Sequence, residues 1–144
     1  MKTLLALLTF TFCIAVHAAE FQRTVQSMDI PTYPPLAYQL RIQGTVKLSV
    51  VVNGDGQVTK ATVTSGHQLL QAAAAENVKT WRFVALPSSS SSEVAITYVY
   101  KIEGEEIPYA EPDRRRSRVS LDLPASVEVS AAPMKIETVA TDSR

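Results

Sequence analysis

The sequence is poor in the residue types on which catalysis, metal binding and covalent cross-linking depend. Its 144 residues include two histidines, one cysteine and one tryptophan. The only cysteine, Cys13, lies in an apolar N-terminal run, so the rest of the chain has no disulfide and must rely on its hydrophobic core. The 14 basic and 14 acidic residues balance, which removes the overall field that would attract the protein to nucleic acid.

No arrangement of residues typical of an enzyme is present. His67 has no cysteine or second histidine near it, and no Gly-x-Ser-x-Gly elbow surrounds any serine. Residues 53–56 could begin a calcium loop, but the twelfth position, which needs an acidic ligand, is Thr64. We therefore expect no enzymatic activity, no metal, no cofactor, no nucleic-acid partner and no small-molecule substrate.

Residues 1–18 are typical of a secretory signal peptide. Lys2 supplies a positive charge, Leu4–Val16 is an apolar run of 13 residues, and Val16-His17-Ala18 provides small residues where signal peptidase cleaves. The run is shorter than the roughly 17–25 apolar residues that a membrane span needs. Export with cleavage is therefore expected, or inner-membrane association if the signal is retained. Residues 19–30 lack a clear period and are predicted to be a mobile leader.

Residues 31–104 carry the periodic patterns of one domain. Tyr33-Pro34-Pro35 predicts the start of a short helix, since proline is tolerated in a first helical turn, and Gly44 is the expected left-handed cap. Residues 45–52 alternate between apolar and mixed positions and predict a strand. The Asn-Gly and Asp-Gly pairs of residues 53–56 predict a hairpin turn.

The second half of this domain continues the pattern. Residues 57–65 predict a return strand with a β-bulge near Thr59-Lys60, because the apolar positions slip by one there. Residues 69–81 predict a second helix with Trp81 as a core anchor. Residues 94–102 alternate again and predict a third strand. The order helix-strand-strand-helix-strand predicts a two-layer α+β domain, in which a three-stranded antiparallel-type sheet packs against two helices and the third strand lies beside the first, at an edge.

Residues 105–144 differ in character from this domain. The segment 105–118 is charged, and its arginines at 114–116 could bind phosphate or anionic lipid, although the acidic residues around them favour a self-neutralised linker. The alternating segments 119–123 and 126–130 are too short to fold alone. We expect a charged linker followed by a disordered tail, or by a tail that forms strands only when it pairs with a sheet.

The order of elements and a set of motif residues resemble the C-terminal domain of TonB. The motif residues, which are expected to be mainly structural, are Tyr33, Pro34, Ala37, Gly44, Val46, Gly56, Val58, Trp81, Arg82 and Phe83. In that family the third strand is an exposed edge that accepts the TonB box, an extended segment of an outer-membrane receptor. The resemblance implies an energy-transducer-type module of transmembrane transport in the periplasm of a Gram-negative-type bacterium, with such receptors or other envelope proteins as partners.

The resemblance places the partner-binding site on the predicted third strand. Its residues are Val94, Ala95, Ile96, Thr97, Tyr98, Val99, Tyr100, Lys101 and Ile102. The part from Val94 to Tyr100 contains no charge, proline or glycine, so its main-chain groups are free to pair with an added strand. Two alternatives stay open. The strand is an ordinary core strand covered by the tail, or residues 126–131, which loosely resemble a TonB box, dock on it in the same or a neighbouring molecule.

Three features depart from TonB itself. The N-terminus resembles a removable signal, only 12 residues separate Ala18 from Pro31, and 40 residues follow the predicted domain. The resemblance therefore implies a stand-alone TonB-like domain. The rival function class is a structural envelope module that forms a homodimer by strand exchange or binds cell wall.

Overall fold

Residues 23–86, 90–106 and 117–134 are described by the computed structural model. The predicted signal peptide (1–18) and the arginines at 114–116 lie outside the described residues. Neither helix in the described ranges is long and apolar enough to cross a membrane.

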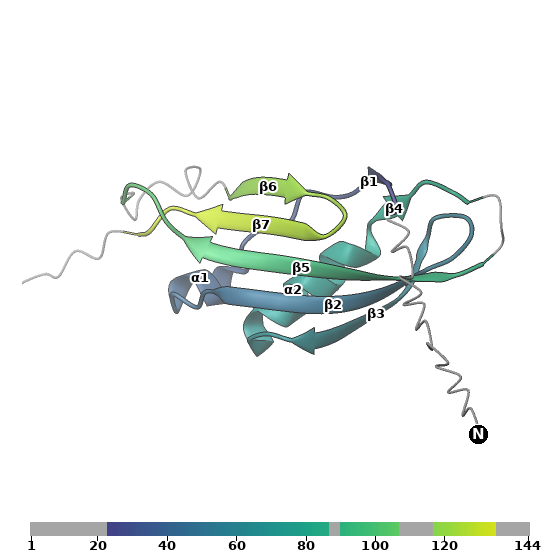
Figure 1. Ribbon diagram of the computed structural model, residues 1–144. Helices are drawn as coiled ribbons and strands as arrows, with labels where there is room; N and C mark the ends of the chain where they lie inside the picture. Colours follow the sequence, from purple (N-terminus) through teal and green to yellow (C-terminus); the bar gives the residue numbers. More distant parts are fainter. Residues whose placement is uncertain (1–22, 87–89, 107–116, 135–144) are drawn as a thin grey trace, which may run out of the picture.

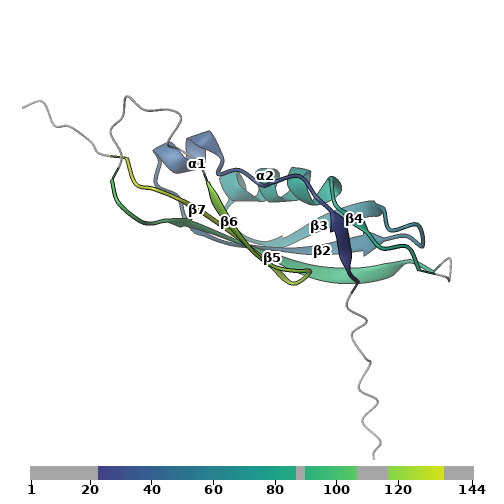
Figure 2. The ribbon, with the colours of Figure 1, turned by 90° about the horizontal axis from the view of Figure 1, so that it is seen from above.

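The described residues form two helices and seven strands. In chain order these are β1 (Val25–Ser27), α1 (Pro35–Gln39), β2 (Gly44–Val52), β3 (Val58–Ser65), α2 (Gln68–Lys79), β4 (Arg82–Phe83), β5 (Ser92–Ile102), β6 (Arg118–Asp122) and β7 (Ser126–Ala131). Both helices lie on one face of the larger sheet (Figures 1 and 2). The two-layer α+β architecture and the order helix-strand-strand-helix-strand are therefore confirmed by α1, β2, β3, α2 and β5.

The larger sheet has five strands in the order β3-β2-β5-β7-β6. β2 is antiparallel to both β3 and β5, whereas β7 is parallel to β5 and β6 is antiparallel to β7. The prediction of a three-stranded antiparallel sheet is therefore wrong, because the tail adds two strands and one parallel pairing. The expectation of a disordered tail is also wrong for residues 118–131. Neither segment could fold alone, and β5 supplies the edge that makes them strands.

Residues 23–30 are packed against the domain, so the prediction of a mobile leader is wrong for them. β1 pairs with β4 in a small second sheet. The side chain of Arg23 is only 2% exposed, and its Nη1 donates to the carbonyl of Asn53 at 2.7 Å. The main-chain carbonyl offsets part of the cost of burying the guanidinium. The partners of this segment lie far along the chain, which is why no local pattern marks it.

The hairpin of β2 and β3 contains the predicted β-bulge. Val51 pairs with Lys60 and Val52 pairs with Val58, so the register skips Thr59. A second shift skips Thr64. Each skipped threonine donates its hydroxyl to a carbonyl of β2, Thr59 at 3.2 Å and Thr64 at 3.1 Å. These side-chain bonds replace main-chain ladder bonds that a bulge interrupts.

The predicted hairpin turn at residues 53–56 is confirmed, and Gly56 fixes its place in the fold. The N–H of Gly56 donates to the carbonyl of Asn53 at 3.1 Å, and the N–H of Phe83 donates to the carbonyl of Gly56 at 2.8 Å. Gly56 has a φ of 83°, and a Cβ on it would lie 1.9 Å from the carbonyl oxygen of Phe83. The chain after α2 therefore crosses the turn at a distance that only glycine permits.

α1 does not end at the glycine that was expected to cap it, and a histidine precedes α2. Arg41, with a φ of 53°, takes the left-handed position after α1, and Gly44 instead begins β2 with a φ of 145°. The N-cap of α2 is His67, whose Nδ1 accepts the N–H of Leu69 at 3.2 Å. Capping satisfies a helix donor that would otherwise lack a partner. This structural role accounts for the isolated histidine.

The core lies between the helices and the sheet, with one polar side chain at its margin. Its members with at most 2% exposure include Val46, Leu48, Val50, Val52, Leu70, Ala74, Val78, Trp81 and Tyr98. Asn77 of α2 accepts the Tyr98 hydroxyl at 2.7 Å and the Trp81 indole N–H at 3.2 Å through its Oδ1. Its Nδ2 donates to the carbonyl of Asp29 at 2.8 Å. One amide thus joins the helix, β5 and the N-terminal segment.

We expect Asn77→Ala to lower the free energy of unfolding by about 2–3 kcal/mol, because two buried donors lose their acceptor. Urea unfolding followed by Trp81 fluorescence measures the change. Gln71→Ala is the matched control, since Gln71 lies on the same helix and makes one exposed bond to the carbonyl of Gly66. Its cost should be within about 0.5 kcal/mol. Equal costs for the two variants would contradict the role given to Asn77.

Candidate partner-binding edge

The predicted partner-binding strand is β5, and it does not form an edge along its whole length. On one side it pairs with β2, from Gly44↔Tyr100 to Val52↔Ser92. This confirms that the third predicted strand lies beside the first. On its other side, residues 97–102 pair with β7, from Thr97↔Ser126 to Ile102↔Ala131 (Figure 1). The expectation of a free edge is therefore wrong for this half of the strand.

β7 is attached to β5 by main-chain bonds that reach both of its ends. The N–H of Thr97 donates to the carbonyl of Ala125 at 2.9 Å, and the N–H of Glu103 donates to the carbonyl of Ala131 at 2.8 Å. The contact of residues 126–131 with the third strand, one of the two alternatives left open by the sequence, is thus present within one molecule. The cover extends over six register pairs of β5.

On the helix-covered face, the side chains of β7 complete the core. Val127 pairs with Tyr98 and Val129 pairs with Tyr100, and both valines are fully buried. Ala131 is 4% exposed. The rings of Tyr98 and Tyr100 stack with centroids 6.3 Å apart. The pattern of β-branched side chains next to aromatic rings is one of the favourable neighbour pairs in a sheet.

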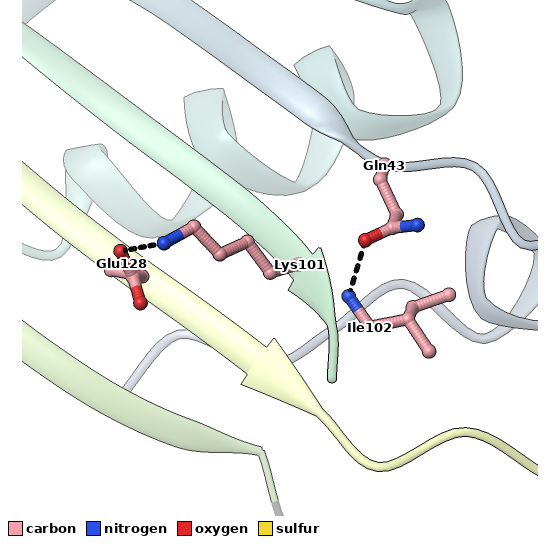
Figure 3. Close-up of polar contacts among 4 residues, drawn as sticks. All are labelled: Gln43, Lys101, Ile102 and Glu128. Atoms are coloured by element: carbon pink, nitrogen blue, oxygen red, sulfur yellow. Dashed lines mark hydrogen bonds and ion pairs between the residues drawn. The ribbon is translucent and has the colours of Figure 1, made fainter. Parts of the chain in front are cut away.

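On the opposite face, charge complements this contact. The Nζ of Lys101 lies 2.7 Å from a carboxylate oxygen of Glu128 (Figure 3). The hydrogen bond to Glu128 is the main cause that raises the pKa of Lys101. Beside it, the N–H of Ile102 donates to the Oε1 of Gln43 at 2.6 Å. The ion pair is partly exposed, so it adds little to the stability of the contact. Its main effect is to favour an acidic residue at the position of Glu128.

The chain after β7 is also held by α1 and the loop that follows it. The Tyr38 hydroxyl donates to the carbonyl of Ala132 at 2.6 Å. The Nη2 of Arg41 donates to the carbonyl of Met134 at 3.0 Å. Both acceptors are main-chain groups, so these contacts would form with many sequences at these positions.

The other half of β5, Ser92–Ile96, has no strand on the β7 side within the described residues. We name it the open half of β5. Main-chain groups of successive residues in a strand point in opposite directions. Since the N–H of Thr97 points toward β7, those of Glu93 and Ala95 point to the same, unpaired side. Both residues are exposed, so the open half presents main-chain donors and acceptors to an added strand.

The motif residues lie elsewhere, around the core and the hairpin turn. Of the ten, Tyr33, Ala37, Val46, Gly56, Trp81 and Phe83 are buried, Pro34 and Val58 are half-buried, and Gly44 and Arg82 are exposed. None lies on β5. Their positions are those of residues that shape the domain, and the outer side of β5 is built from residues outside the motif.

A family comparison identifies the class of protein. The sequence profile described as "Gram-negative bacterial TonB protein C-terminal" matches residues 29–103, which is more than half of the chain. The chain therefore belongs to the TonB C-terminal domain family. Domains of this family are non-catalytic energy-transducer modules, so the protein is not an enzyme, as the sequence predicted. Membership implies interaction with TonB-dependent receptors in energy-coupled transport in the Gram-negative envelope.

The chain is also similar to a solved structure. That structure is described as "Solution NMR structure of Pseudomonas aeruginosa TonB CTD", and it is 23% identical, with 61% of this chain and 94% of that chain covered and a TM-score of 0.48. No curated protein matches the chain.

Proposed function

We propose that this protein is a periplasmic module that binds extended segments of TonB-dependent outer-membrane receptors by strand addition to β5, over residues 94–102. In this proposal residues 31–104 are the receptor-binding unit, and residues 1–18 direct export. The observation that supports it is the pairing of β5 with a six-residue extended segment of the tail, Ser126–Ala131. A strand that accepts this segment presents the main-chain pattern that any other extended segment would use.

The surroundings of β5 favour a short peptide over a folded surface. Main-chain bonds provide affinity, and the sites beside Tyr98 and Tyr100 receive alternate side chains from one face of the added strand. Lys101 lies on the other face of β5. It favours an acidic residue in the added strand, at the position between the two side chains that cover the tyrosines. The open half of β5 offers main-chain groups without displacement of any described strand.

The proposal predicts where a receptor peptide changes the protein's NMR spectrum. The ¹⁵N-labelled protein is titrated with a synthetic peptide that carries the TonB box of a receptor. The titration is repeated with Val129→Asp, which disrupts the tail strand by placing a charge at a fully buried site. Shifts should concentrate on residues 94–102. Absence of shifts there in both proteins would contradict the proposal.

A proline substitution tests the main-chain contact directly. The N–H of Ala95 points away from β2, so Ala95→Pro removes a donor from the open half of β5 and leaves the pairing with β2 intact, a position at which strands tolerate proline. We expect it to weaken peptide binding about 3- to 10-fold, the effect of one lost hydrogen bond. Ala95→Val, which keeps the N–H, is the control and should bind like the wild type. Equal binding by all three would show that the peptide does not pair there.

A further inference from the structure

We propose that the β6–β7 hairpin, residues 118–131, is a built-in competitor that closes the partner-binding edge, and that an incoming segment of matching pattern replaces it. This inference rests on the proposed function and specifies its regulation. The hairpin occupies the outer side of β5 over Thr97–Ile102. A second strand cannot use the same main-chain groups, so binding over this half requires the hairpin to leave.

The hairpin is separable from the domain that it covers. The family match ends at residue 103, and the hairpin begins at Arg118. Its strand pairing with the rest of the protein is to β5. The residues just outside the hairpin, Ser117, Ala132 and Met134, accept hydrogen bonds from Tyr33, Tyr38 and Arg41. Of the 18 buried hydrophobic residues in the core cluster of the described ranges, three belong to the hairpin, Val127, Val129 and Ala131. The other 15 lie in the residues that the family profile matches. Loss of the hairpin therefore leaves the helices and three strands of the family domain in place.

Replacement requires a partner that restores what the hairpin buries. Val127 and Val129 cover Tyr98 and Tyr100, and exposure of this apolar surface opposes simple opening. An incoming segment with equivalent side chains would bury the same two tyrosines in place of the hairpin. The pattern of β7 then defines the partner: a β-branched apolar residue, an acid to pair with Lys101, a second β-branched residue, and two small residues.

The open half of β5 gives the incoming segment a place to begin. A partner that runs parallel to β5 in the manner of β7 would first pair with the exposed groups of Glu93 and Ala95. It would then extend toward Ile102 and displace β7 one residue at a time from Ser126 onward. Each step exchanges a main-chain bond for an equivalent one, so the hairpin need not dissociate completely before binding starts.

The tether makes the hairpin a strong competitor despite its short contact. An intramolecular segment on a short linker acts at an effective concentration near the millimolar range. A free peptide of the same sequence at micromolar concentration therefore loses to it. The apparent dissociation constant of any partner equals its intrinsic dissociation constant divided by the fraction of molecules in which the hairpin has left β5.

The first test uses the protein's own sequence as the probe. A synthetic peptide of residues 125–132 is titrated into the full-length protein and into Val129→Asp. The inference predicts an apparent dissociation constant at least about tenfold lower for the variant. Val84→Asp is the matched control, because Val84 is an exposed valine outside the hairpin, and it should bind like the wild type. Equal affinities for wild type and Val129→Asp, or no binding to the variant while its amide spectrum stays folded, would overturn the inference.

The second test locks the hairpin without disturbing the core. Thr97 and Ser126 are register partners, so Thr97→Cys with Ser126→Cys, in a Cys13→Ser background, provides a reversible disulfide between β5 and β7. The oxidised protein should lose binding of the 125–132 peptide over residues 97–102, and dithiothreitol should restore it. Binding that is equal in both redox states would overturn the inference. The 125–132 peptide can bind as predicted while a receptor peptide does not bind even Val129→Asp. That result would support the role of the hairpin as a competitor and contradict the proposed receptor partner.

Discussion

Replacing Gly56 with alanine is expected to lower the free energy of unfolding by about 2–5 kcal/mol, from the combined cost of a left-handed backbone and a steric clash. The added Cβ would lie 1.9 Å from the carbonyl oxygen of Phe83 and 2.8 Å from its carbonyl carbon. Both are main-chain atoms, so relief requires the segment after α2 to move away from the turn. That movement also breaks the bond from the Phe83 N–H to the Gly56 carbonyl.

Gly104→Ala separates the two contributions to this cost. Gly104 has a φ of 106°, and no atom lies within 4 Å of a Cβ placed on it. Its substitution should therefore cost only the backbone term, about 1–2 kcal/mol. Urea unfolding followed by the fluorescence of Trp81, the sole tryptophan, measures both variants. Equal losses would mean that the contact with Phe83 relaxes freely.

The second large effect is a loss of stability at high pH. Burial raises the pKa of Tyr33 to about 12, and it also raises the pKa values of Tyr98 and Tyr100. The ring of Tyr33 meets that of Tyr100 edge-on at 5.4 Å, so an ionised ring would repel its neighbour. Since the folded-state pKa values lie above the unfolded value of about 10, stability is complete below pH 10 and falls as the pH rises through the folded-state values.

Each tyrosine that stays protonated in the fold contributes a slope of about 1.4 kcal/mol per pH unit in this range. Urea unfolding between pH 8 and pH 12, with tyrosinate absorbance recorded in parallel, measures the slope. Tyr100→Phe should make it shallower by one tyrosine. This variant should cost little at pH 8, because the Tyr100 hydroxyl is buried without a hydrogen-bond partner among the described residues. Tyrosinate absorbance that accounts for all five tyrosines before the protein unfolds would contradict the prediction.

Much of the domain could be predicted because its signals are local. The hairpin turn at 53–56 follows from residues that accept positive φ, and the bulge at Thr59 follows from a one-residue slip in apolar positions. The helix that precedes Trp81 follows from apolar residues at helical spacing. In each case the pattern and the structure that it produces occupy the same short stretch of chain.

The features that were missed depend on distant partners. β1 has three residues and no period, and it is a strand because Val25 pairs with Phe83. His67 has no catalytic or metal-binding neighbours in the sequence, and its role as the N-cap of α2 comes from the geometry of the turn before the helix. The alternation of residues 126–131 was visible, yet alternation does not state which strand is the partner or whether the pair is parallel.

The candidate site was predicted in part for the same reason. The uncharged pattern of Val94–Tyr100 identifies a strand with an edge that invites pairing, and the structure pairs half of that edge with the tail. The open half of β5 could not be predicted from the sequence. Its extent depends on where β7 begins, and the hairpin turn that contains Pro124 places that beginning opposite Thr97. Whether receptors use this edge stays a prediction until the peptide titrations are made.

The two edge strands of the five-stranded sheet, β3 and β6, also affect the solubility of the protein. β3 has two register shifts and β6 has five residues with Arg118 and Asp122 at its ends, and both features make a strand a poor template for other chains. β5 without its cover would offer the uncharged edge from Val94 to Tyr100, which is the kind of surface that drives aggregation. The hairpin therefore sets how concentrated the protein can become before its molecules associate with one another, whatever partner it binds.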